Sequence, residues 1–227
     1  MSDYIDSIEN KMFHGINLKY YHTKLEELKI FEQILKSGKI MTRNDLKKIK
    51  YEYFSYLPKI YEQDENEICF AMHPKNKEFC YVYDEEDLSS AFYQYIRFNI
   101  SFVFSESILN NYNLQNGIPG EIRISNSLNL YGNLVAIGCF DEIEYLLEMV
   151  ETGKKRNIMF GKQLISSKDI HKYVLEKKKR TYNIKEILMN YGYNVPIIDP
   201  ITGKKIDCNY EEDIETVKKL KNILIYK

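Results

Sequence analysis

The sequence contains no tryptophan, only 5 prolines and 10 glycines among 227 residues, and 4 cysteines that lie far apart. It has no Cys-x-x-Cys pair and no histidine cluster at zinc-ligand spacing, so neither a zinc knuckle nor a disulfide framework is indicated. The scarcity of proline and glycine leaves no long flexible linker. We expect buried free thiols at the four cysteines, which are Cys69, Cys80, Cys139 and Cys208.

Several sequence motifs of common enzymes and of membrane proteins are also missing. There is no Gly-x-Gly-x-x-Gly, no Gly-x-x-x-x-Gly-Lys-Ser and no Gly-x-Ser-x-Gly, so a Rossmann site, a P-loop and a nucleophile elbow have no support. No run approaches the roughly 18 apolar residues of a membrane span, and the N-terminal segment is acidic without an apolar core. We therefore expect a cytoplasmic protein, or one delivered into a host cell cytoplasm by a dedicated secretion system.

The charges are balanced overall but unevenly distributed. The 32 basic and 33 acidic residues give a formal net charge of -1, which favours no polyanionic or polycationic partner. Residues 61–88 contain nine carboxylates and two lysines, whereas Lys154 to Arg180 contains ten basic residues and two acidic ones. The basic stretch can contact nucleic acid, and a solvated helix face is the alternative explanation.

The order of predicted elements indicates an α+β body, residues 1–152, followed by a mainly helical, charged region, residues 153–227. Apolar and alternating segments predict strands at 67–72, 79–83, 99–104, 120–124 and 134–140. Short helices are expected at 88–95, 105–109 and 141–151, and a loop at 196–203 interrupts the helical C-terminal region.

The clearest local signal is a helix that follows Thr23. Thr23-Lys24-Leu25-Glu26 reads as a capping box, apolar residues follow at helical spacing, and Gly38 supplies the left-handed residue that ends a helix. A short extended piece comes next. Thr42 or Asn44 then caps a second, basic helix with Arg43 at the junction.

None of the four histidines has a second histidine close enough in sequence to indicate a metal site or a catalytic triad. His22 lies where a strand is expected to end and the capped helix to begin, and helix N-termini favour anions, so a pyrophosphate can be held there. The alternative is a histidine that only hydrogen-bonds a neighbouring carbonyl. Cys69 and His73 suit a thiol–imidazole pair only in a helix, and their β-like surroundings separate them.

Three motifs in order resemble ADP-ribosyltransferase-like domains. They are Tyr20-Tyr21-His22-Thr23 with a helix ending Ser37-Gly38 and an arginine after a short strand, then Ser101–Leu109, then Pro119–Ile124. The nearest pattern is that of the DNA-targeting mono-ADP-ribosyltransferase toxins of bacterial toxin–antitoxin pairs. The similarity covers about residues 18 to 142 and implies a split β-sheet core with flanking helices and a helical C-terminal tail.

The resemblance also implies an NAD site, with NAD as a substrate. His22, with Thr23 beside it, would bind the nicotinamide-side ribose or the diphosphate, as the first-strand histidine does in such folds. Arg43 would clamp a phosphate with its planar fork of donors. This chain lacks the Ser or Tyr that commonly packs on nicotinamide in the family, and Phe70 or His73 would supply that face instead.

Glu121 matches the family's catalytic glutamate, near the start of a strand. It would hold the ribose 2′-hydroxyl and stabilise the oxocarbenium-like charge as nicotinamide departs. The alternative is an exposed strand residue that pairs with Arg123, two positions along on the same face. Arg123 itself has two readings, a substrate contact or no functional role.

The hypothesis is therefore an NAD-dependent mono-ADP-ribosyltransferase, of the glycosyltransferase class, that modifies a nucleic acid or a protein as a bacterial or phage toxin or effector. The alternative is a non-catalytic α+β binding or regulatory protein that uses the basic region Lys154–Arg180 to contact a nucleic-acid or protein partner.

Overall fold

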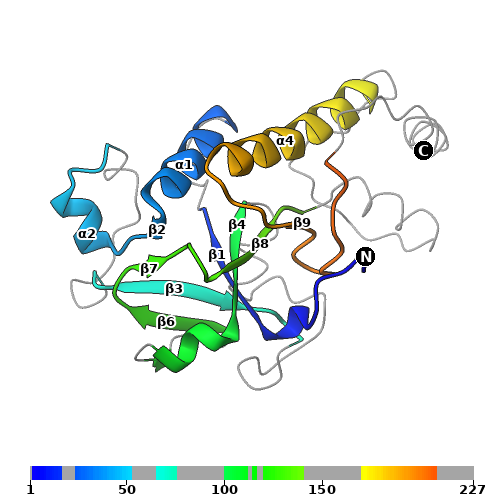
Figure 1. The fold of residues 1–227 in the computed structure, drawn as a ribbon. Coiled ribbons are helices and arrows are strands. Elements are labelled where there is room, and N and C mark those ends of the chain that lie inside the picture. Colours follow the sequence, from blue (N-terminus) through cyan, green and yellow to red (C-terminus); the bar gives the residue numbers. More distant parts are fainter. Residues whose placement is uncertain are drawn as a thin grey trace. The chain divides into compact units, whose positions relative to one another are not determined.

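The computed structural model describes residues 2–16, 24–52, 65–75, 100–111, 114–116, 120–140 and 170–208. These residues form a mixed α+β fold built on a mostly antiparallel sheet (Figure 1). The chain divides into two compact units, residues 1–140 with 187–206, and residues 141–186 with 207–227. None of the described helices is long and apolar enough to cross a membrane.

Among the described residues, the large sheet contains seven strands in the order β5-β6-β3-β1-β4-β8-β9, and β2 and β7 form a separate ribbon. The strands are β1 (Lys11–Gly15), β2 (Lys39–Ile40), β3 (Glu67–Met72), β4 (Ser101–Ser105), β5 (Leu114–Asn116), β6 (Glu121–Ser125), β7 (Leu128–Asn129), β8 (Leu134–Gly138) and β9 (Ile197–Ile198). The helices are η1 (Ile8–Asn10), α1 (Lys24–Ser37), α2 (Arg43–Lys48), η6 (Glu106–Asn111) and α4 (Ile170–Asn190).

The large sheet consists of two halves joined by a short register. β1 pairs with β3 only through Met12 opposite Met72 and Phe13 opposite Ala71, whereas β1–β4 and β3–β6 each pair through five residue pairs. Figure 1 shows β3 and β6 running across the direction of β1 and β4. The sheet therefore divides between β1 and β3, with β5-β6-β3 as one half and β1-β4-β8-β9 as the other.

Aromatic rings fill one face of the sheet. The ring of Phe31 on α1 lies 5.5 Å from that of Phe102, and Phe70 meets Phe104 edge-on at 5.6 Å. All four rings are at most 1% exposed. Large rings in edge-on and tilted contacts bury much apolar area, so this cluster stabilises both α1 and the sheet.

Smaller apolar side chains fill the other face near β1. Ile5 of the N-terminal segment and Ile201 of the turn after β9 pack against it, and the Ile5 amide donates to the Gly203 carbonyl at 3.0 Å. Gly203 has a φ of +74°, which L side chains rarely adopt, and a Cβ there would lie only 3.1 Å from the Cβ of Ile8. Both the backbone conformation and the limited space therefore favour glycine at this position. The buried cluster comprises Ile8, Phe13, Ala71, Val103, Ala136 and Ile198.

The helix predicted after Thr23 is confirmed. α1 ends at Ser37, and Gly38 has a φ of +68° while its amide donates to the carbonyls of Ile34 and Leu35. Thr42, and not Asn44, caps α2. Thr23 and the side chain of Glu26 lie outside the described residues.

The predicted strands at 67–72, 99–104, 120–124 and 134–140 correspond to β3, β4, β6 and β8, and the segment expected as a helical turn at 105–109 is η6. The sequence reading missed β1, the central strand, and the short strands β5 and β7. It also missed β9, which lies inside the expected loop at 196–203. The elements expected at 79–83, 88–95 and 141–151 lie outside the described residues.

The prediction of buried thiols is correct for Cys139 and Cys208 and wrong for Cys69, which is exposed. Cys69 lies opposite Arg123 in the β3–β6 register, so its side chain points to the polar part of that face, beyond the apolar cluster. Cys80 lies outside the described residues.

The aromatic cluster leads to a stability prediction. Phe104→Ala should lower the free energy of unfolding by about 3–5 kcal/mol, because it removes a fully buried ring and leaves a cavity. Tyr131→Ala is the control, since Tyr131 is 88% exposed and should change stability by less than about 0.5 kcal/mol. Urea unfolding followed by circular dichroism measures both, and similar losses for the two variants would contradict the assigned core.

Candidate functional site

Strand β3 connects the described residues that are candidates for function. Glu65, just before β3, meets Arg43. Phe70 lies within β3, His73 follows it, and Glu121 stands opposite Ala71 on β6. The candidate site is therefore built from the two edges and the two ends of one strand.

The division of the sheet places a histidine at the edge of β3. Beyond the Phe13–Ala71 pair the backbone register of β1 and β3 stops, and the Cys69 carbonyl accepts a hydrogen bond from His14 Nδ1 at 2.9 Å. The His14 ring lies 5.6 Å from that of Phe70. A side chain thus bonds a strand carbonyl at the point where the two halves diverge.

This contact fixes the tautomer of His14. A carbonyl oxygen only accepts, so Nδ1 carries the proton and Nε2 presents a lone pair in the neutral ring. Part of the residue is exposed, but the ring lies among packed atoms, and this desolvation lowers the pKa of His14 against the opposing effect of the Cys69 carbonyl. Nε2 forms no hydrogen bond with the residues that the structure describes.

Glu121 and Arg123 form an ion pair on the opposite face of the sheet. Arg123 Nε lies 2.8 Å from Glu121 Oε1, and Arg123 Nη1 lies 3.5 Å from Glu67 Oε2. The expected pairing of Glu121 with Arg123 is thus confirmed as a contact, whereas the expectation that Glu121 is exposed is wrong, since its side chain is only 15% exposed. This contact leaves Glu121 Oε2 without a hydrogen bond to any described residue.

His14 and Glu121 approach β3 from its two edges. Where the sheet is regular, strands two apart lie about 10 Å from each other. The register nevertheless puts Glu121 on the face of Ala71 and Phe13, whereas the His14 ring packs against Phe70 on the other face. The two side chains lie at neighbouring residues of β3 but do not touch.

Arg43 lies at the other end of β3 from Glu121. Its Nε is 3.8 Å from Glu65 Oε1, and Lys47 Nζ contacts the same oxygen. Glu67 stands opposite Ser125, four residues from the Ala71–Glu121 pair, a separation of about 13 Å along the strand. The structure therefore does not bring Arg43 beside Glu121.

Phe70 and His73 are both buried. Phe70 is 1% exposed between His14 and Phe104, so its ring fills the core. His73 Nε2 donates to the Ile201 carbonyl at 2.8 Å, and its Nδ1 accepts from the Lys75 amide at 3.2 Å. Both ring nitrogens of His73 therefore bond within the protein, where they tie the end of β3 to the turn after β9. His22 and Thr23 lie outside the described residues.

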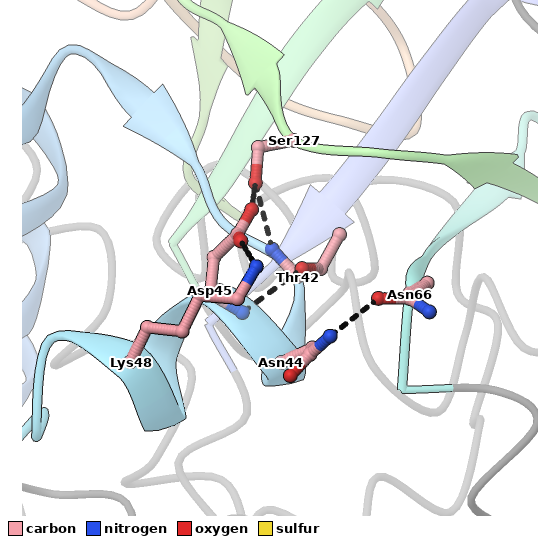
Figure 2. A network of polar contacts seen from close by, with 6 residues as sticks. All are labelled: Thr42, Asn44, Asp45, Lys48, Asn66 and Ser127. Carbon is pink, nitrogen blue, oxygen red and sulfur yellow. Dashed lines mark hydrogen bonds and ion pairs between the residues drawn. The ribbon is translucent and has the colours of Figure 1, made fainter.

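A separate polar network lies at the start of α2 (Figure 2). Asp45 accepts from Ser127 Oγ at 2.6 Å and from Lys48 Nζ at 3.0 Å. The Ser127 hydrogen bond, and after it that of Lys48, lowers the pKa of Asp45. These groups bond to one another, which indicates a structural role in anchoring α2 to the turn before β7. The residues drawn are Thr42, Asn44, Asp45, Lys48, Asn66 and Ser127.

The basic run Lys177–Arg180 lies on α4. Four consecutive residues on an α-helix point in directions about 100° apart, so they surround the helix and cannot form a single basic face. Only Lys179 of the four is fully exposed, and Lys177, Lys178 and Arg180 have contacts within the protein. Residues 154–169 lie outside the described residues.

Comparisons with protein-family models, with curated proteins and with solved structures give no match. Within the described ranges, no group of three or more His, Cys, Asp or Glu side chains is placed to hold a metal ion.

Two residues of the site were missed in the sequence. His14 ends the apolar pair Met12-Phe13 and precedes a glycine, a pattern that indicates a strand end, but the stretch is only five residues long. Glu67 was assigned to a strand, yet its contact with Arg123 spans 56 residues of sequence and carries no local signal.

The burial of His73 leads to a prediction about pH. Desolvation lowers the pKa of His73 from 6.5 to about 4. Below about pH 6.5 the unfolded chain binds a proton at His73, whereas the folded protein does not bind it until about pH 4. The free energy of unfolding therefore falls as the pH drops through this window, by about 3 kcal/mol in total.

His73→Gln removes this titration but also loses a ring, so it should be less stable than the wild type at pH 7 and the gap should narrow toward pH 4. Urea unfolding at pH 7, 6, 5 and 4 measures the gap. A gap that stays constant with pH would show that His73 is not held neutral.

Proposed function

We propose that this chain is an NAD-dependent mono-ADP-ribosyltransferase that modifies a macromolecule as a toxin or effector, and that its sheet is an ADP-ribosyltransferase-like split core. The observation that carries the proposal is the division of the sheet between β1 and β3 with a histidine at the division. A split sheet is what the resemblance of the three sequence motifs implies. β4 and β6, which carry two of those motifs, lie in the two different halves.

We assign to His14 the first-strand role that the sequence analysis gave to His22. The resemblance assigns NAD binding to a histidine on the first strand, and the first described strand of the sheet is β1. Since the His14 ring is neutral with its Nδ1 proton engaged, Nε2 can accept a hydrogen bond from a hydroxyl of NAD on the Phe70 face of the sheet, the face opposite Glu121. His22 and Thr23 remain predicted contacts of the ribose or the diphosphate.

Glu121 is the proposed catalytic carboxylate. In the reaction, the bond between the ribose C1′ and the nicotinamide nitrogen breaks, and nicotinamide leaves with the bonding electrons. A nucleophile of the acceptor then bonds to C1′ and loses its proton to solvent or to a base. Glu121 Oε2 can accept a hydrogen bond from the ribose 2′-hydroxyl, and the negative charge of the carboxylate stabilises the positive charge that develops on the sugar.

The test is the release of nicotinamide from NAD by the full chain, measured by chromatography. We expect slow release in the absence of an acceptor. Glu121→Gln should abolish it while leaving the melting temperature nearly unchanged, because the amide keeps the size of the side chain and one acceptor oxygen. Glu176→Gln, the same change at an exposed position on α4, is the matched control and should retain wild-type release.

His14→Phe separates the proposed contact from the fold. It keeps a ring against Phe70 but loses both nitrogens, so we expect the KM for NAD to rise about tenfold, the loss of roughly one hydrogen bond. Wild-type protein that neither releases nicotinamide nor shows a thermal shift with NAD would refute the enzyme and favour the non-catalytic binding protein.

A further inference from the structure

We propose that Arg123, anchored by Glu67, is a positioning residue that holds the carboxylate of Glu121 in one orientation toward the ribose. This inference rests on the proposed function, because it concerns how the proposed catalytic group is fixed. The evidence is a bridge of three charged side chains over two strands, with one oxygen of Glu121 engaged and the other available.

The register of β3 and β6 brings the three side chains together. Arg123 and Glu121 are two residues apart on β6, so both point to the same face. Cys69 is directly opposite Arg123, and Glu67 is its diagonal neighbour on β3, within reach of a long side chain. The guanidinium thus extends between a carboxylate of its own strand and one of the next strand.

The burial of the three groups assigns them different roles. The side chain of Glu67 is 6% exposed, that of Glu121 is 15% and that of Arg123 is 28%. The buried carboxylate of Glu67 is therefore the anchor. A guanidinium has donors in a rigid plane, so the contact to Glu67 limits the rotation of the Arg123 head and directs its Nε–H at Glu121.

The bridge leaves a negative charge in place. Two carboxylates and one guanidinium sum to a charge of about -1, so Arg123 does not neutralise the group as a whole. The Arg123 Nε–H donates to Glu121 Oε1 at 2.8 Å, a distance within the range of charge-assisted hydrogen bonds. Oε2 then points away from the bond, and this is the oxygen left for a ribose hydroxyl.

A fixed carboxylate is useful to the proposed chemistry. A glutamate side chain has several rotamers, and choosing one of them on binding costs conformational entropy. A bridge that selects the rotamer before the substrate arrives removes this cost from the reaction, which is how preorganised groups stabilise a transition state. A positioning residue should therefore affect kcat more than KM.

The test compares Arg123→Met and Arg123→Lys with the wild type in the nicotinamide-release assay. Met keeps much of the unbranched aliphatic chain and loses every donor, so we expect kcat to fall at least about tenfold while KM changes less than about threefold. Lys keeps the charge but has no fork to span both carboxylates, so it should restore only part of the rate. The kcat of Glu67→Gln should lie between that of the wild type and that of Arg123→Met.

A second readout does not need turnover. The Nε–H of a hydrogen-bonded arginine exchanges slowly with water and gives its own signal in proton–nitrogen NMR spectra. We expect the Arg123 signal in the wild type to be protected, and its exchange to quicken severalfold in Glu121→Gln and in Glu67→Gln, since each change removes one charged partner.

The outcomes distinguish the two proposals. A wild type that releases no nicotinamide overturns the proposed function and this inference with it. An active wild type whose Arg123 Nε–H exchanges at the same rate in Glu121→Gln overturns the inference alone. An Arg123→Met variant with wild-type kcat also overturns the inference. If its KM is raised while kcat is unchanged, Arg123 is a substrate contact. If its rate is higher than that of the wild type, the ion pair is inhibitory.

Discussion

The hydrogen bond from His14 to the Cys69 carbonyl is the contact on which the candidate site depends. Where two strands diverge, backbone groups lose their ladder partners, and a carbonyl left unpaired and away from water is costly. The imidazole occupies that position and links β1, in one half of the sheet, to β3 in the other. The same bond places the proton on Nδ1 and makes Nε2 an acceptor, while burial of the ring, against the effect of this bond, lowers the pKa of His14. One contact therefore sets both the geometry and the tautomer at the division.

Basic side chains compensate part of the negative charge of the acidic stretch 61–88 along β3. Residues 61–88 have an excess of carboxylates and by composition repel phosphate. Among the described residues of that stretch, Glu65 meets Arg43 and Lys47, and Glu67 meets Arg123. The basic partners come from α2 and β6, elements distant in sequence. The local field near β3 is therefore set by pairs that assemble only on folding, and much less by composition.

The sequence predicted the features whose causes are local. α1 could be delimited because its apolar spacing and Gly38 lie within the helix or next to it, and the Glu121–Arg123 pair follows from a two-residue period. β1 was missed because its burial comes from β3 and β4, not from its own composition. The His14–Cys69 contact spans 55 residues, and a single sequence contains no signal for such a register. For the basic run Lys177–Arg180 the sequence suggested a cluster that the structure does not form, because the turn of α4 points consecutive side chains in different directions.

The parallel pairing of β9 with β8 has a consequence for synthesis on the ribosome. β9 supplies Ile197 and Ile198 to the edge of a sheet whose other described strands all precede residue 140, and most of the chain between them, residues 141–186, belongs to the second unit. The edge of β8 is thus without its partner until residue 198 has been made and has left the exit tunnel. During that interval the nascent chain presents an apolar strand edge, the kind of surface that chaperones bind and that pairs with other chains when they do not.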